Sequence, residues 1–136
     1  MDNNFHNYQL RVYYEDTDAG GIVYYANYLK FFERARTEWL RALGINQSIY
    51  LEQNLGFVVT KVEMDNIASA KLDDLLNVKT TISELKRASL VFNQQISNQE
   101  QVLLCTIKVK VAHVNLELAK PYVIPKAILG ALKRVS

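Results

Sequence analysis

One stretch of the chain, residues 14–28, combines the residue types from which acyl-transfer chemistry can be built. It contains the carboxylates Asp16 and Asp18, the adjacent glycines Gly20 and Gly21, and the predicted start of a helix. A carboxylate can act as a base or a nucleophile, and backbone N–H groups beside glycines can stabilise an oxyanion. Acyl transfer uses both functions, so this segment is the predicted active site.

Asp18 is the candidate reactive carboxylate. As a nucleophile it would form a mixed anhydride with the acyl group, which water then hydrolyses. As a general base it would activate water directly. The residues leave both routes open, beside a purely structural role for Asp18 in a turn. Asp16 is interpreted as structural, and Gly20 and Gly21 as positions that need positive φ or a close approach of the backbone to a ligand.

Hydrophobic periodicity predicts the elements that must position this segment. Residues 8–14 alternate as a strand does, with Tyr8, Leu10, Val12 and Tyr14 on one side. Residues 27–43 have a helical period, and Gly44 stands where a C-terminal cap belongs. A short helix over 46–54 is predicted next. Four strands then follow at 57–68, 75–85, 89–97 and 102–115, and a last helix at 125–133.

Composition and charge favour one soluble domain spanning residues 1–136. The 136 residues carry a formal net charge of +2 without a basic block, which argues against nucleic-acid binding. No apolar run is long enough to span a bilayer, and the first residues lack the order of a secretion signal. Cys105 is the single cysteine, which suits a reducing compartment, so a cytoplasmic location is expected. His113 has no ligand partners at metal spacing, and no metal is predicted.

The order of elements predicts an α+β architecture. One long apolar helix and one half-apolar antiparallel sheet must cover each other, and a sheet curled around the helix does so.

The same order and the motif resemble the hotdog fold, and more narrowly the YbgC branch of the 4-hydroxybenzoyl-CoA thioesterase family. The resemblance covers nearly the whole chain. It is carried by residues 12–24, 27–28, 32–38, 72–74, 89–92 and 120–121.

The resemblance implies hydrolysis of acyl-CoA thioesters without metal or other cofactor, by a homodimer or homotetramer whose active sites lie between subunits. Asp18 occupies the slot of the family's catalytic carboxylate. The N–H of Tyr25, at the unpaired and partly positive start of the helix, falls where the family's carbonyl-polarising N–H lies. Some members of the branch carry His where this chain has Tyr25. Tyr24 is expected to line the pocket.

The resemblance also places contacts to the CoA phosphates near Lys86, Arg87 and Ser89, where cations suit the ligand. A solvated hairpin turn is the alternative. An acyl carrier protein is a further expected partner, and the association of the branch with Tol-Pal gene neighbourhoods suggests a link to envelope or lipid metabolism.

Three alternatives to the thioesterase stay open at this point. The first is a non-catalytic module that binds acyl-CoA or an acyl carrier protein. The second is a hydratase or dehydratase of acyl thioesters, which would be expected to use a histidine that the motif lacks. The third is a structural protein of the envelope. The length of the acyl group is not predicted.

Overall fold

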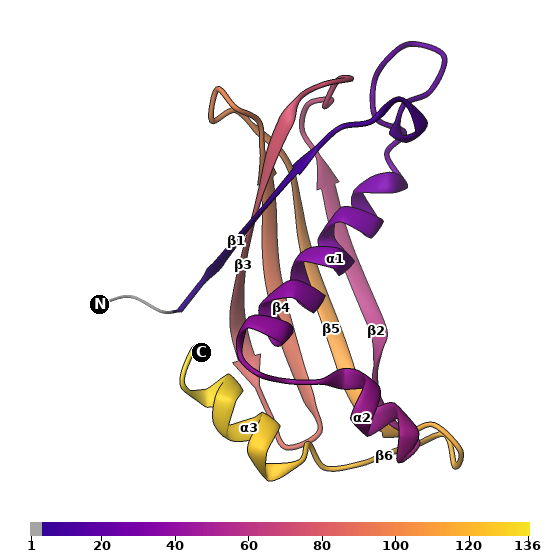
Figure 1. Ribbon diagram of the computed structural model, residues 1–136, viewed down its shortest axis with the longest axis vertical. Helices are drawn as coiled ribbons and strands as arrows, with labels where there is room; N and C mark the ends of the chain where they lie inside the picture. Colours follow the sequence, from indigo (N-terminus) through magenta and orange to yellow (C-terminus); the bar gives the residue numbers. More distant parts are fainter. Residues whose placement is uncertain (1–3) are drawn as a thin grey trace.

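Helix α1, Asn27–Ala42, is the element around which the rest of the chain is built. The computed structural model describes residues 4–136, and in it a single antiparallel sheet curls along this helix (Figure 1). The helix ends in a turn where the N–H of Gly44 donates to the carbonyl of Arg41 and Gly44 has a φ of 83°. Glycine adopts that left-handed conformation without strain. The predicted sheet wrapped around a helix is confirmed.

The sheet has the strand order β1-β3-β4-β5-β2, and every neighbouring pair is antiparallel. A short sixth strand, β6, pairs with β5. The strands are β1 (His6–Arg11), β2 (Leu55–Asn66), β3 (Leu75–Leu85), β4 (Ser89–Ser97), β5 (Leu103–Asn115) and β6 (Lys120–Pro121).

Within residues 4–136, three short helical segments complete the fold. They are the 3-10 turn η1 (Tyr14–Asp16), α2 (Gln47–Glu52) and α3 (Lys126–Lys133). The side chain of Asn46 accepts a hydrogen bond from the N–H of Ser48 at 3.1 Å, so α2 has a polar N-cap as such residues commonly provide. Among the described residues, no helix is both long and apolar enough to cross a membrane.

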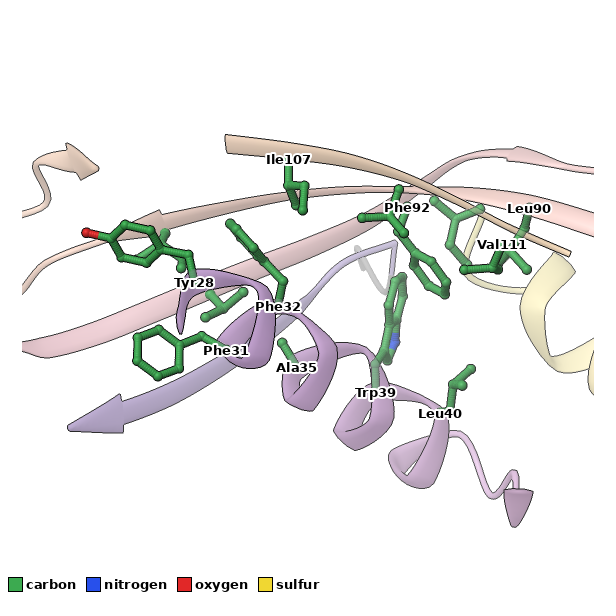
Figure 2. Close-up of a cluster of buried hydrophobic side chains, with 14 of the residues drawn as sticks. Tyr28, Phe31, Phe32, Ala35, Trp39, Leu40, Leu90, Phe92, Ile107 and Val111 are labelled. Carbon is green, nitrogen blue, oxygen red and sulfur yellow. The ribbon is translucent and has the colours of Figure 1, made fainter. Parts of the chain in front are cut away.

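The core lies between α1 and the concave face of the sheet. Phe32 is fully buried, and the ring of Trp39 packs against that of Phe92 with centroids 6.4 Å apart. Figure 2 shows Phe32 and Trp39 pointing from the helix toward the strands, and Phe92 of β4 lying beside Trp39. Strand β3 alternates as a half-buried strand should, and its inward positions are buried: Leu76, Val78, Thr80 and Ile82.

The side-chain amide of Gln94 is a polar group buried in this core. The amide nitrogen of Gln94 donates to the carbonyl of Phe32 at 2.9 Å and to the hydroxyl of Thr80 at 3.0 Å. Its amide oxygen accepts from the Arg36 guanidinium at 2.9 Å. Buried polar groups need such partners, and these bonds fix α1 against β3 and β4.

The first strand differs from its prediction. It runs over His6–Arg11 and not over residues 8–14, and Tyr14 is 82% exposed and does not face the core. The chain leaves the sheet because the carboxylate of Asp16 accepts a hydrogen bond from the N–H of Tyr13 at 2.9 Å and closes η1. Val12 is buried as expected.

Strand β2 has one free edge within residues 4–136, because it pairs with β5 alone. It is twelve residues long, and most of its side chains are exposed, including Val58, Val59 and Val62. A long unpaired edge with several exposed apolar side chains is a surface that proteins normally cover.

Candidate active site

The Asp18 carboxylate is fixed at one oxygen. Its Oδ1 accepts a hydrogen bond from the N–H of Gly20 at 2.8 Å. The backbone around it is closed by two further bonds, from the N–H of Asp18 to the carbonyl of Ile22 at 2.9 Å and from the N–H of Gly21 to the carbonyl of Asp18 at 3.1 Å. For Oδ2 of Asp18, no hydrogen-bond donor is found in the part of the chain that the structure describes. One carboxylate oxygen is therefore held while the other is available for chemistry.

The two glycines differ in what they contribute. Gly21 has a φ of 76°, a conformation that side chains other than glycine rarely adopt. At Gly20 an added Cβ would lie 3.3 Å from Oδ1 of Asp18, tighter than ordinary contact. The turn that presents Asp18 thus uses the backbone freedom of one glycine and the small size of the other.

The loop is fastened directly to the start of α1. The carbonyl of Asp16 accepts hydrogen bonds from the N–H of Tyr24 at 3.1 Å and from the side-chain amide of Asn27 at 2.9 Å. Its carboxylate caps η1, as described above. These bonds agree with the structural role predicted for Asp16, and they tie the carboxylate-bearing turn to the helix N-terminus.

A second set of bonds holds the loop from the other side. The N–H of Val23 donates to the carbonyl of Ala70 at 2.8 Å, and the N–H of Ala70 donates to the hydroxyl of Tyr28 at 2.9 Å. Tyr28 is buried, and this burial raises the pKa of its phenol above the ordinary range. The N–H of Leu72 also donates to the carbonyl of Gly21 at 3.2 Å. The segment 70–72, which lies between β2 and β3, therefore supports the Asp18 loop.

Sequence reasoning missed Tyr28 and Asn27 as residues that position the site. The helical period of residues 27–43 accounts for the buried ring of Tyr28, but nothing in that period shows that its hydroxyl has a partner 42 residues later. Asn27 was seen only as a helix start. An amide or hydroxyl in the first turn of a helix beside a glycine-containing loop is the signal that could have identified both.

The N–H of Tyr25 lies just before the first turn of α1. Ala26 is the N-cap, and no acceptor for the Tyr25 N–H is found among residues 4–136. Unpaired N–H groups at the start of a helix carry partial positive charge and favour an anionic oxygen. The rings of Tyr24 and Tyr25 are about half exposed and pack together with centroids 5.1 Å apart.

Lys86, Arg87 and Ser89 lie in and beside the turn between β3 and β4. The ammonium of Lys86 is 3.4 Å from the carboxylate of Glu84, and the carbonyl of Arg87 accepts from the N–H of Ile124 at 2.7 Å. In Figure 1 this turn lies at the end of the sheet opposite the Asp18 loop. The length of β3, about 33 Å at roughly 3.3 Å per residue, separates the two regions within one chain.

His113 is a buried side chain of the sheet. Its Nδ1 lies 2.8 Å from the carbonyl oxygen of Tyr122, and its ring packs edge-on against Phe57.

Cys105 is a buried core thiol on the inner side of β5. Burial, with a smaller contribution from Asp65, raises the pKa of this thiol from 9.0 to about 11. At pH 8 the thiolate fraction in the folded protein is then about a hundredfold lower than in the unfolded chain. We expect a thiol reagent to modify Cys105 about a hundredfold more slowly in native buffer than in denaturant. Equal rates would show that the thiol is accessible.

The chain is similar to known proteins over almost its full length. Residues 12–132 match the family model described as "Thioesterase-like superfamily". The chain is 50% identical over 132 residues to "Acyl-CoA thioesterase YbgC" of Haemophilus influenzae, with 96% of each protein covered. It is 42% identical over 134 residues to "Acyl-CoA thioester hydrolase YbgC" of Escherichia coli, covering 98% of this chain and 100% of that relative.

A solved structure gives the same result. The "Probable Thioesterase from Bartonella henselae" superposes with a TM-score of 0.82 at 43% identity, covering 89% of this chain and 99% of that one.

Proposed function

The chain belongs to the thioesterase-like superfamily and is an acyl-CoA thioester hydrolase, and from that premise we propose that the Asp18 loop and the N-terminus of α1 form its catalytic site. The observation that carries the proposal is the pairing of two groups on one tethered loop. Asp18 keeps one carboxylate oxygen free of described donors, and the Tyr25 N–H has no acceptor within residues 4–136.

Two routes use these groups in the same geometry. In the first, Asp18 attacks the thioester carbon, the C–S bond breaks, and CoA leaves as a thiolate that takes a proton from solvent. Water then splits the resulting anhydride into the free acid and the Asp18 carboxylate. In the second, Asp18 takes a proton from a water whose oxygen attacks the same carbon, and the departing thiolate receives a proton.

The Tyr25 N–H serves either route. Negative charge develops on the carbonyl oxygen as the carbon becomes tetrahedral, and a fixed N–H donor stabilises that charge. Because the donor belongs to the backbone, the proposal does not depend on whether the side chain is Tyr or His. The side chains of Tyr24 and Tyr25 and the backbone of Gly20 and Gly21 form the proposed walls around the reacting group.

The experiment that tests this function is thiol release from a panel of short, long and aromatic acyl-CoAs. Turnover of any of them at rates well above buffer supports hydrolysis. Binding without turnover would favour the acyl-CoA binding module instead. The panel also includes thioesters of acyl carrier protein, because this protein is an alternative to CoA as the carrier of the acyl group.

We propose that the enzyme is a homodimer formed through the free edge of β2. Pairing two copies of this edge would cover the exposed valines of β2 and remove an unpaired strand. In such a dimer, Lys86, Arg87 and Ser89 of one subunit would lie near the other subunit's active loop. They would be closer to a CoA bound there than to a CoA bound at the Asp18 loop of their own chain. Two such dimers could then associate into a homotetramer through a second, separate interface.

A cytoplasmic location and a link to envelope or lipid metabolism remain proposals. The first is supported by the single cysteine, Cys105, which is buried. The second is supported only by the similarity to the YbgC branch.

Replacing Val62 by Lys is expected to convert the dimer into a monomer at micromolar concentration. Val62 is 43% exposed in the single chain, so the fold should tolerate the change, while a desolvated ammonium in the paired edge would not. Light scattering after gel filtration measures the mass. The matched control is Gln9→Lys on β1, which adds the same charge to the opposite edge of the sheet. A Val62→Lys protein that stays dimeric would place the interface elsewhere.

A further inference from the structure

A cavity of about 180 Å³ lies between α2, the start of β2, the end of β5 and α3, and it is called the α2 cavity below. In Figure 1, α2 and α3 lie at the end of the sheet opposite the Asp18 loop. Its lining includes Tyr50, Leu51, Leu55, Phe57, His113 and Ile128. An apolar pocket with a few placed polar groups is the usual form of a small-molecule site.

A second cavity, of about 120 Å³, borders the first. It lies beside α1, where Glu33 and Arg36 contribute to its lining. Gln47 and Phe57 line both cavities and therefore form the boundary between them. His113 lines the α2 cavity and is absent from the lining of the other. The two cavities thus differ in chemistry, with an imidazole in one and ionised side chains in the other.

His113 presents one free nitrogen. The residue is 1% exposed, and its Nδ1 lies 2.8 Å from the carbonyl oxygen of Tyr122. A carbonyl oxygen can only accept a hydrogen bond, so Nδ1 carries the proton and the neutral imidazole has a lone pair at Nε2. For Nε2, no hydrogen-bond partner is found within residues 4–136.

The free Nε2 faces open space. In the part of the chain that the structure describes, Nδ1 of His6 is the only fully enclosed side-chain polar atom that lacks a partner. Nε2 of His113 also lacks a partner, so it is not fully enclosed, and the α2 cavity that His113 lines provides the space beside it. A buried acceptor without a partner is unfavourable, and a ligand that donates a hydrogen bond to it would remove that penalty.

The wall around this acceptor is apolar and largely aromatic. The ring of His113 packs edge-on against Phe57 with centroids 5.0 Å apart, and Tyr50 contributes a further ring to the lining. Aromatic rings favour edge-to-face and offset contacts with another ring. The surroundings of Nε2 therefore suit an aromatic ligand better than a chain-like one.

We propose that the α2 cavity binds a small aromatic alcohol of the size of phenol, whose hydroxyl donates a hydrogen bond to Nε2 of His113. A dry, apolar protein cavity of about 150 Å³ can hold benzene. The α2 cavity, at about 180 Å³, has room for such a ring with one hydroxyl. A hydrocarbon would leave Nε2 unpaired, and a carboxylate has no proton to donate to it. This site is independent of thioester hydrolysis, because neither Asp18 nor Tyr25 lines the cavity.

The test compares phenol with toluene, which carries a methyl group in place of the hydroxyl. Calorimetric titration of the full chain at pH 8, where phenol keeps its proton, measures both dissociation constants. A cavity without an acceptor prefers toluene, because the hydroxyl of phenol loses its hydrogen bonds to water. We expect the wild-type protein to bind phenol at least as tightly as toluene.

His113→Leu removes the acceptor and keeps an apolar side chain in its place. We expect the preference for phenol over toluene to fall about tenfold in this variant, the upper range of one neutral hydrogen bond, while toluene still binds. This pattern separates a hydrogen bond to Nε2 from a general effect of the substitution on the shape of the cavity.

Leu51→Trp locates the site. Leu51 lines the cavity and is 52% exposed, so the fold should tolerate a larger side chain that fills the space. Binding of both compounds should weaken at least tenfold, because the ring would occupy the volume that each needs. Ile49→Trp is the matched control. Ile49 lies on the same helix, is 50% exposed and does not line the cavity, so both dissociation constants should stay within about twofold of wild type.

Several outcomes would overturn the proposal. They are no binding of phenol at millimolar concentration, tighter binding of toluene than of phenol to the wild type, or an unchanged preference in His113→Leu. Phenol binding that survives Leu51→Trp would place the ligand elsewhere, the cavity beside α1 included. If His113→Leu does not fold, the wild-type comparison together with Leu51→Trp and Ile49→Trp decides the question.

Discussion

Asp18→Asn is expected to lower kcat/KM for acyl-CoA hydrolysis by about 10³-fold or more, the range in which loss of a general base or nucleophile falls. Asparagine keeps an oxygen that can accept the hydrogen bond from the Gly20 N–H, so the turn should keep its shape. The amide cannot take a proton from water, and it cannot form the anhydride. Thiol release at saturating and at limiting substrate measures kcat and kcat/KM separately.

The control for this variant lies three positions away. Glu15 is exposed in η1, and Glu15→Gln removes a nearby charge without touching the turn at Asp18. It should leave kcat/KM within about twofold of wild type. Turnover by Asp18→Asn at more than one tenth of the wild-type rate would contradict the role given to Asp18.

Phe32→Ala is expected to destabilise the fold by about 3–5 kcal/mol, the usual cost of removing a buried aromatic ring. Phe32 has no exposed surface and packs between α1 and the sheet (Figure 2). Its carbonyl also accepts the hydrogen bond from Gln94, and the cavity left by the ring would loosen that contact. Urea unfolding followed by circular dichroism measures the free energy difference.

Leu29→Ala is the matched substitution on the same helix. Leu29 is 42% exposed, so its loss should cost less than about 1 kcal/mol. If both variants lost the same free energy, the face of α1 that the sheet covers would not be the one that stabilises the protein.

The regular elements could be predicted from the sequence because each repeats its own period. Strand β3 matches its prediction over residues 75–85, and α1 ends one residue before the predicted boundary, beside the expected glycine. The first strand was misplaced for a physical reason. The alternation continues through Val12 and Tyr14, but the Asp16 carboxylate turns the chain at Tyr13, and a local hydrogen bond outweighs the pattern.

The reactive residues of the candidate site could be predicted from the sequence, but the residues that hold the loop in place could not. The residue types of the loop identified Asp18 and the glycines, since few other combinations place a carboxylate beside exposed N–H groups. The hydroxyl of Tyr28 and the segment 70–72 could not be predicted, because contacts between residues 42 positions apart leave no local pattern. That Glu33 and Arg36 line a common cavity could not be predicted either, because the rest of its wall comes from strands that are distant in the sequence.

The supports of the Asp18 loop also determine when the site can appear during synthesis. Val12 exchanges hydrogen bonds with Asp73 and Asp74, and within residues 4–136 β1 pairs with β3 alone. Contacts of such long sequence separation form late, because the loop between them must first be closed. A nascent chain that ends before residue 80 therefore has the Asp18 sequence but no shaped active site. Acyl thioesters meet a competent site only after most of the sheet has left the ribosome.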